Sequence, residues 1–282
     1  RRLVGSEMCI RDRFNNTELN GPTGEDNQMS FTPKGTFLCI SPWNFPVAIL
    51  IGQISAALSC GNRVIVKPSE YSSILGYLVV KKFHDHGVPI SALSLILGDG
   101  LYGDFLTKIR PLHGVAFTGS LPTAKKIQAN IIDNQNQIIT LIAETGGVNT
   151  MIVDSSALLE QVTDDVVRSA FDSAGQRCSA LRVLCVQEEI YDDLKDMIIG
   201  NMQIQTVGDP NFFDTDIGPI INDKAYKKLT SYISLCSEKG YKIHQPNQKV
   251  SDMHIAPTLI EINSISNITE ERFGPILHIL KY

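Results

Sequence analysis

Short runs rich in β-branched residues alternate with segments of helical apolar spacing along most of the chain. In the first half the strand-like runs and helical segments are, in order, 36–40, 47–60, 64–66, 70–86, 93–97, 114–118, 120–132 and 138–143. Neighbouring parallel strands need a crossover connection, usually a helix, so this alternation is typical of consecutive βαβ units. The sequence therefore predicts an α/β protein with a parallel sheet.

A second alternation follows a weak break near 145–150. Its segments are strand 150–153, helix 158–173, strand 181–187, helices 190–203 and 222–239, and strands 241–245, 255–262 and 277–282. With 282 residues and about 150 residues per domain, two domains are expected, at 30–145 and 146–282. Segment 14–29 is polar and rich in Asn, Gly and Thr, which predicts a linker or part of an edge hairpin.

Composition excludes several classes of function for this segment. The formal net charge is −5 and no basic block is present, so a nucleic-acid partner is not expected. The longest apolar run, Val47 to Ile51, is far shorter than the roughly 18 residues of a membrane span. The six cysteines show no zinc spacing, so we expect no metal site and reduced thiols in a cytoplasmic compartment.

Both ends of the sequence are unusual. Residues 1–13 have no helical or strand period and resemble translated adapter sequence rather than protein, with a real N-terminal helix as the alternative. At the other end, the strand-like run 277–282 stops with nothing after it. We therefore expect the chain to be a fragment, truncated at both ends.

Cys178 is the candidate nucleophile. It lies in Gly175-Gln176-Arg177-Cys178-Ser179, between a helical stretch and a strand, where small neighbours leave room for a ligand. A thiol becomes a good nucleophile when nearby cations or helix N-termini stabilise its thiolate. The alternative is a buried structural cysteine, which we expect for Cys39, Cys60, Cys185 and Cys236.

Glu144 is the candidate general base. It ends a strand and precedes Thr145-Gly146-Gly147, at the edge where α/β proteins place their ligands. The alternative is an ordinary solvated carboxylate at a strand end.

Strand-to-helix turns supply further candidates. Lys67 and Glu70 are spaced to hold the two hydroxyls of a ribose, or to form a salt bridge together with a cap at a helix start. Gly119 and Ser120 offer backbone N–H groups for a pyrophosphate, or an ordinary N-cap. Asn44 can donate to an oxyanion, or serve only the turn. The standard Gly-x-Gly-x-x-Gly dinucleotide fingerprint is absent.

Taken together, the motifs resemble the aldehyde dehydrogenase superfamily over residues 30–282. They are, in order, Pro42-Trp43-Asn44-Phe45-Pro46, Lys67-Pro68-Ser69-Glu70, Phe117-Thr118-Gly119-Ser120, Glu144-Thr145-Gly146-Gly147, Gly175-Gln176-Arg177-Cys178, Gly208-Asp209-Pro210, Gly218-Pro219 and Glu271-Arg272-Phe273-Gly274-Pro275. Arg272 departs from the pattern, because the family more often has an apolar residue there.

The resemblance implies a fold, a cofactor and a set of roles. It implies a partial Rossmann-type NAD-binding domain at 30–145 and a partial α/β catalytic domain at 146–282, with 14–29 in an oligomerisation hairpin. Cys178 would be the nucleophile, Glu144 the base and Asn44 an oxyanion donor, with Ser179 binding substrate. The implied NAD-binding residues are Ser41, Pro42, Trp43, Lys67, Ser69, Glu70, Gly119, Ser120, Glu271 and Phe273.

Segments 141–147, 152–158 and 170–182 resemble more narrowly the aldehyde dehydrogenase module of bacterial bifunctional proline utilisation flavoproteins. That module oxidises L-glutamate γ-semialdehyde, which is in equilibrium with 1-pyrroline-5-carboxylate, to glutamate with NAD. The resemblance implies a homo-oligomeric, cytoplasmic bacterial parent fused to a flavin-dependent proline dehydrogenase domain. Val148 departs from it, since Gln is usual there.

Two alternatives remain beside this function. One is another semialdehyde dehydrogenase, such as one for succinate semialdehyde; the other is an inactive fragment that only keeps the fold. Glu144 favours thioester hydrolysis over acyl transfer to coenzyme A, and Glu70 favours NAD over NADP. We expect the 282-residue chain by itself to be poorly folded or inactive.

Overall fold

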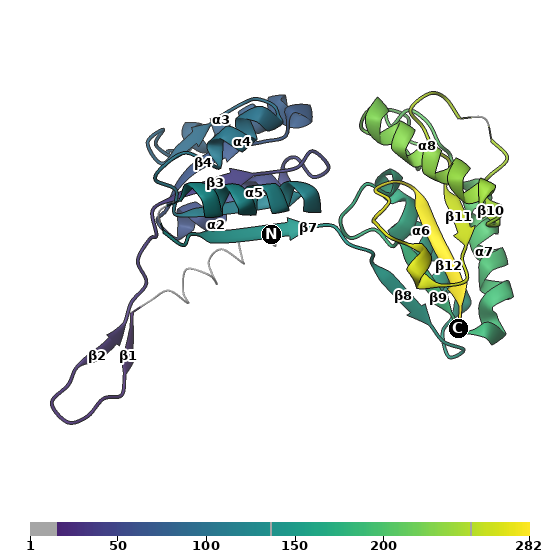
Figure 1. The fold of residues 1–282 in the computed structure, drawn as a ribbon, viewed down its shortest axis with the longest axis horizontal. Coiled ribbons are helices and arrows are strands. Elements are labelled where there is room, and N and C mark those ends of the chain that lie inside the picture. The colour runs from purple at the N-terminus through teal and green to yellow at the C-terminus, as the bar shows by residue number, and fades with distance from the viewer. Residues whose placement is uncertain (1–15, 136, 249) are drawn as a thin grey trace. The chain divides into compact units, whose positions relative to one another are not determined.

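The computed structural model describes residues 16–135, 137–248 and 250–282. It contains two compact units, the first ending at Thr145 and the second beginning at Gly146 (Figure 1). Each unit is built on its own sheet and is described by itself. The prediction about residues 1–13 lies outside the described residues.

The first unit contains a five-stranded, fully parallel sheet in the order β5-β4-β3-β6-β7. The strands are β3 (Thr36–Ile40), β4 (Arg63–Lys67), β5 (Leu93–Leu95), β6 (Gly114–Gly119) and β7 (Thr140–Thr145). The chain builds outward from β3 through β4 to β5, and then returns to the other side of β3 for β6 and β7. The strand order therefore reverses between β3 and β6, and open α/β sheets bind ligands at such a point.

Helices cover both faces of this sheet, as predicted for βαβ units. They are α2 (Ala48–Ser59), α3 (Ser73–Asp85) after a short 3₁₀ turn η1 (Glu70–Ser72), α4 (Gly100–Leu106) and α5 (Leu121–Asn134). One buried cluster joins the sheet to α2 and α3 through Leu50, Ile54 and Val80. The other joins it to α4 and α5 through Leu106 and Ile127.

Two local features of this unit concern expectations from the sequence. Helix α4 was not predicted, because Gly100 and Gly103 interrupt its short sequence. Segment 14–29 was left open between linker and hairpin. Its described part forms a hairpin of β1 (Thr17–Leu19) and β2 (Asn27–Met29), and a role in oligomerisation stays a prediction.

The second unit contains a five-stranded sheet in the order β10-β11-β12-β9-β8. The strands are β8 (Thr150–Val153), β9 (Val183–Val186), β10 (Ile243–His244), β11 (Thr258–Glu261) and β12 (Ile276–Lys281). This sheet is parallel except at one edge, where β10 pairs antiparallel with β11. No helix connects β10 to β11, and a direct connection between neighbouring strands produces an antiparallel pair.

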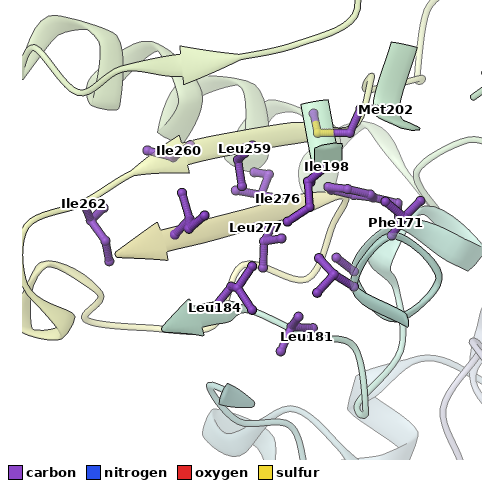
Figure 2. Close-up of a cluster of buried hydrophobic side chains, with 14 of the residues drawn as sticks. Phe171, Leu181, Leu184, Ile198, Met202, Leu259, Ile260, Ile262, Ile276 and Leu277 are labelled. Atoms are coloured by element: carbon purple, nitrogen blue, oxygen red, sulfur yellow. The ribbon is translucent and has the colours of Figure 1, made fainter. Parts of the chain in front are cut away.

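The helices of this unit pack on a single apolar core. They are α6 (Leu159–Phe171), α7 (Tyr191–Ile204) and α8 (Asp223–Glu238), with 3₁₀ turns η2 (Asp172–Gly175), η3 (Glu188–Ile190) and η4 (Ile265–Asn267). Figure 2 shows Leu259 and Leu277 on neighbouring strands, among Phe171, Ile198 and Met202. No helix in the described part of the chain is long and apolar enough to cross a membrane.

Candidate active site

A cavity of about 330 Å³ lies at the carboxyl ends of β3, β4 and β6 in the first unit. It occupies the point where the strand order reverses, as expected for a ligand site in an open α/β sheet. Eight residues that the sequence singled out for cofactor binding line this cavity. They are Ser41, Pro42, Trp43, Lys67, Ser69, Glu70, Gly119 and Ser120.

Lys67 is a buried ammonium in the wall of this cavity. Lys67 is the last residue of β4, and its Nζ donates to the Pro68 carbonyl oxygen at 3.2 Å. The carboxylate of Glu70 instead accepts from Ser69 Oγ at 3.5 Å, so these contacts do not support the alternative of a Lys67–Glu70 salt bridge. Burial lowers the pKa of Lys67, and the nearby charges of Glu70 and Asp99 counteract that shift. A largely buried ammonium that lines a cavity can bind an anionic or hydroxyl group of a ligand.

Ser41 carries a buried hydroxyl that has no hydrogen-bond partner among the described residues. Its residue is 3% exposed and lines the cavity directly after β3. A buried hydroxyl without a partner lowers stability unless a ligand completes its hydrogen bonds. The cavity therefore offers an unused hydrogen-bonding group in addition to Lys67.

Helix α5 begins at the cavity and presents its N-terminus there. Ser120 caps the helix by accepting from the Thr123 backbone N–H at 3.4 Å, as the alternative to phosphate binding had foreseen. A capping Ser120 does not prevent phosphate binding, because the other backbone N–H groups of the first helical turn can still bind an anion. At Gly119 an added Cβ would lie 2.6 Å from the Phe117 ring, so a larger residue there would displace that ring.

The cavity also contains polar residues that the sequence did not single out. Asp104 forms ion pairs with Lys108 and Lys126, both at 2.7 Å, and accepts from Asn130 at 3.0 Å. These hydrogen bonds hold the pKa of Asp104 well below its usual range. Asp104, Lys126 and Asn130 line the cavity. Asp104 lies on α4, the helix that the sequence failed to predict, so no motif could mark it.

Asn44 and Glu144 belong to the first unit. Asn44 lies in the turn after β3, and Glu144 is exposed on the edge strand β7. The catalytic roles expected for these two residues stay predictions.

In the second unit, Cys178 lies on an exposed turn that a strained segment introduces. Helix α6 ends at Phe171, and Ser173, Ala174 and Gly175 then adopt left-handed φ angles of 57°, 53° and 62°. The predicted helix 158–173 thus ends two residues early. At Gly175 an added Cβ would lie 2.1 Å from the Gly274 carbonyl oxygen, so this position requires glycine.

Hydrogen bonds to neighbouring segments fix the turn that carries Cys178. The side-chain amide of Asn149 donates to the carbonyl oxygens of Cys178 and Ala180 at 2.8 and 2.9 Å. Gln176 donates to the Pro219 carbonyl at 3.1 Å and accepts from the Ile221 N–H at 2.9 Å. Gln176 therefore helps to hold the turn in place. The role of Asn149 was missed, because its partners lie about 30 residues further along the chain.

Cys178 differs from the other described cysteines in its exposure. Cys39 and Cys236 are buried, and Cys60 and Cys185 are half-buried. Burial raises the pKa of the Cys39 thiol to about 12 and also raises that of Cys185. These thiols are poor nucleophiles, whereas Cys178 is exposed, as is its neighbour Ser179.

Glu271 and Phe273 both contact Arg182, which the sequence did not single out. The Arg182 guanidinium donates to Glu271 Oε1 from Nε at 3.2 Å and from Nη2 at 3.0 Å, and lies 5.4 Å from the centre of the Phe273 ring. Arg272, the departure from the family pattern, stacks 3.8 Å from the Tyr232 ring and forms an ion pair with Glu270. The local packing thus accommodates Arg272. No cluster of metal-ligating side chains occurs among the described residues.

The sequence model of the aldehyde dehydrogenase family matches residues 7–282. The chain belongs to this family. The α/β fold that the motifs imply is confirmed, and it is built on one parallel and one mixed sheet.

Curated relatives place the chain within a narrower group. It is 45% identical over 269 residues to the bifunctional protein PutA of Klebsiella aerogenes, covering 91% of this chain and 20% of that protein. It is 31% identical over 267 residues to 1-pyrroline-5-carboxylate dehydrogenase 1 of Halalkalibacterium halodurans, covering 92% and 52%. The chain thus spans about a fifth of the length of the first of these relatives and about half of the second.

Solved structures of aldehyde dehydrogenases share the fold of this chain. A proline utilization A variant from Bradyrhizobium japonicum superimposes with a TM-score of 0.94 at 41% identity, covering 98% of this chain and 29% of that one. Betaine aldehyde dehydrogenase from Staphylococcus aureus, solved in complex with NAD⁺, has a TM-score of 0.91 at 26% identity, covering 98% and 56%.

Proposed function

We propose that the chain contributes to NAD-dependent oxidation of L-glutamate γ-semialdehyde to L-glutamate, within a protein that also carries a proline dehydrogenase activity. The observation that carries the proposal is the exposed Cys178 thiol on a turn held by Asn149, in a chain 45% identical to a bifunctional PutA protein. The 1-pyrroline-5-carboxylate dehydrogenase relatives support the substrate.

The cavity of the first unit fits the adenosine and diphosphate part of NAD. The unpartnered Ser41 hydroxyl, the buried Lys67 ammonium and the N-terminus of α5 all face it, and each can bind hydroxyl or phosphate oxygens. Glu70, exposed at the same cavity, is the proposed acceptor for the ribose hydroxyls. In the second unit, Glu271 and Phe273 are the residues proposed for the nicotinamide half. When bound, NAD supplies the acceptor for the hydride that leaves the aldehyde carbon.

The chain's own residues carry the covalent steps of the proposal. The Cys178 thiolate attacks the aldehyde carbon, and the Asn44 amide and the Cys178 backbone N–H stabilise the oxyanion that forms. Loss of hydride from this carbon leaves a thioester on Cys178. Glu144 then accepts a proton from water, whose oxygen attacks the thioester and releases glutamate and the thiol. Ser179 is the proposed contact to the substrate carboxylate.

The test is NAD reduction by the full gene product that carries residues 1–282, with L-glutamate γ-semialdehyde and succinate semialdehyde in parallel. We expect turnover with the glutamate compound, abolished by Cys178→Ala and unchanged by Cys185→Ala, a half-buried thiol on β9. Faster turnover of succinate semialdehyde would show that the proposed substrate is wrong and that succinate semialdehyde is the better one. Binding of NAD without turnover of either aldehyde would leave a fold that does not catalyse this reaction.

A further inference from the structure

One buried guanidinium joins the segment after Cys178 to the segment that contains Glu271. Arg182 is 1% exposed, and its Nε and Nη2 both donate to Glu271 Oε1, a residue 89 positions further along the chain. Nη1 donates to the Gly274 carbonyl oxygen at 3.1 Å. Nη2 also donates to the Arg177 carbonyl at 3.1 Å, directly before Cys178. A single side chain therefore bonds both segments.

These contacts fix the two oxygens of Glu271 differently. Oε1 accepts both Arg182 bonds, and Oε2 packs against the backbone of Gly146, where an added Cβ would lie 2.0 Å from it. The Phe273 ring lies beside the same guanidinium, 5.4 Å from it. Two donors of one planar guanidinium converge on Oε1, an arrangement that the single ammonium of a lysine does not reproduce.

We infer that Arg182 is a positioning residue for the reaction: it orients the Glu271 carboxylate for the cofactor and holds the turn that carries Cys178. The inference rests on the proposed function, because it assumes that Glu271 binds the nicotinamide half of NAD. Arg182 acts through Glu271 and through the Arg177 carbonyl. Buried ion pairs often give little net stability compared with apolar packing, so stability alone does not explain this pair.

The charge of Arg182 also bears on Cys178. Burial lowers the pKa of Arg182, the Glu271 carboxylate opposes that shift, and the charge of an ionised Cys178 opposes it further. Arg182 thus places a positive charge within electrostatic reach of the Cys178 sulfur. Arg182 therefore has two separable properties, the bonding geometry at Glu271 and the positive charge near Cys178.

The first experiment measures dissociation constants for NAD and for AMP, which lacks the nicotinamide half. In the full gene product we expect Arg182→Gln to weaken NAD binding about tenfold, as for a lost hydrogen bond to a charged group, and to leave AMP binding within about twofold. Because Arg182 acts through Glu271, we expect almost no additional effect of Arg182→Gln in a Glu271→Gln background.

The second experiment separates geometry from charge by using Arg182→Lys. Lysine keeps the positive charge but lacks the planar guanidinium. We therefore expect Arg182→Lys to bind NAD as weakly as Arg182→Gln, while iodoacetamide alkylates its Cys178 at nearly the wild-type rate. Arg182→Gln is expected to slow that alkylation about threefold or more, because the cation is lost. A residue with a merely structural role would not divide the two readouts in this way.

Arg272→Gln is the matched control. It removes the neighbouring arginine, which pairs with Glu270 and stacks on Tyr232, and should change neither the ratio of NAD to AMP affinity nor the alkylation rate. An equal loss of NAD and AMP affinity in Arg182→Gln, or the same pattern in Arg272→Gln, overturns the inference. If the wild type binds neither nucleotide, the proposed function fails too. If it binds both and Arg182→Gln keeps their ratio, only the inference fails.

Discussion

Gly175 is the position where a single methyl group should most disturb the turn that carries Cys178. Its φ of +62° and the 2.1 Å approach of the Gly274 carbonyl oxygen to an added Cβ both oppose alanine. The left-handed conformation alone costs about 1–2 kcal/mol for an L-residue. We expect Gly175→Ala to lower the free energy of unfolding, measured in urea, by more than that amount.

Gly240→Ala provides the control for this prediction. Gly240 has a φ of +77°, but nothing lies within 4 Å of an added Cβ there. Gly240→Ala therefore measures the backbone strain alone, and the difference in unfolding free energy between the two variants measures the clash with Gly274. Equal destabilisation by both substitutions would mean that the turn shifts to admit the methyl group.

His278 predicts a dependence of stability on pH. Burial lowers its pKa to about 4, with smaller contributions from the charges of Arg272 and Arg182. The unfolded chain, with an ordinary histidine pKa near 6.5, binds more protons between these values. The free energy of unfolding is therefore expected to fall, by up to about 3 kcal/mol, as the pH drops from about 6.5 to 4.

Urea titrations at several pH values in that window test the role of His278. His278→Gln should flatten the decline, whereas His86→Gln, at an exposed position on the first unit, should leave it intact. A decline of the same slope in His278→Gln would assign the effect to other groups.

Local chemistry explains which residues could be predicted. Cys178 and Glu144 were singled out because their motifs are contiguous, and the exposure of Cys178 agrees with a reactive thiol. Arg182 was not singled out, because an arginine at the start of a strand-like run has no local signature. Its partner Glu271 lies 89 positions away, and only the fold brings the two together.

Helix caps allow stability and function to be separated at the level of elements. Ser120 caps α5 at the cavity, and Asn222 caps α8 in the second unit by accepting from the Ala225 N–H at 2.8 Å. Replacing either cap with alanine should lower the free energy of unfolding by about 1 kcal/mol. Only Ser120→Ala should also weaken NAD binding, measured by titration. An equal change of NAD affinity in Asn222→Ala would refute the assignment of α5 to the diphosphate.

Elements with a complete local signal were predicted well, and those that depend on tertiary context were not. Helix α2 ends in a Schellman motif at Gly61, as expected from Gly61-Asn62, with the Asn62 N–H bonded to Ala57 and the Gly61 N–H to Leu58. Helix α4 was not predicted, because it is short, contains two glycines and depends on packing for its stability. The antiparallel direction of β10 was not predicted, because a two-residue strand carries no sequence signal for the strand it pairs with.

At the scale of the whole molecule, the two units have separate apolar cores. All buried residues of one cluster belong to the unit that begins at Gly146, and those of the other two clusters lie between Leu38 and Ile139. The expectation that the 282-residue chain is poorly folded or inactive stays a prediction. Separate cores indicate that each unit can fold even where the chain does not complete a catalytic cycle.

Separate folding can be tested with the units themselves. We expect residues 16–145 and 146–282, expressed individually, each to unfold cooperatively in urea, since each contains a sheet, its helices and its own core. The cavity lies entirely in the first piece, so AMP should stabilise that piece alone, by about 2.7 kcal/mol at a hundredfold excess over its dissociation constant. Circular dichroism in urea, with and without AMP, measures both effects. Gradual, non-cooperative unfolding of either piece would contradict independent folding, and equal stabilisation of the second piece would contradict the placement of the nucleotide site.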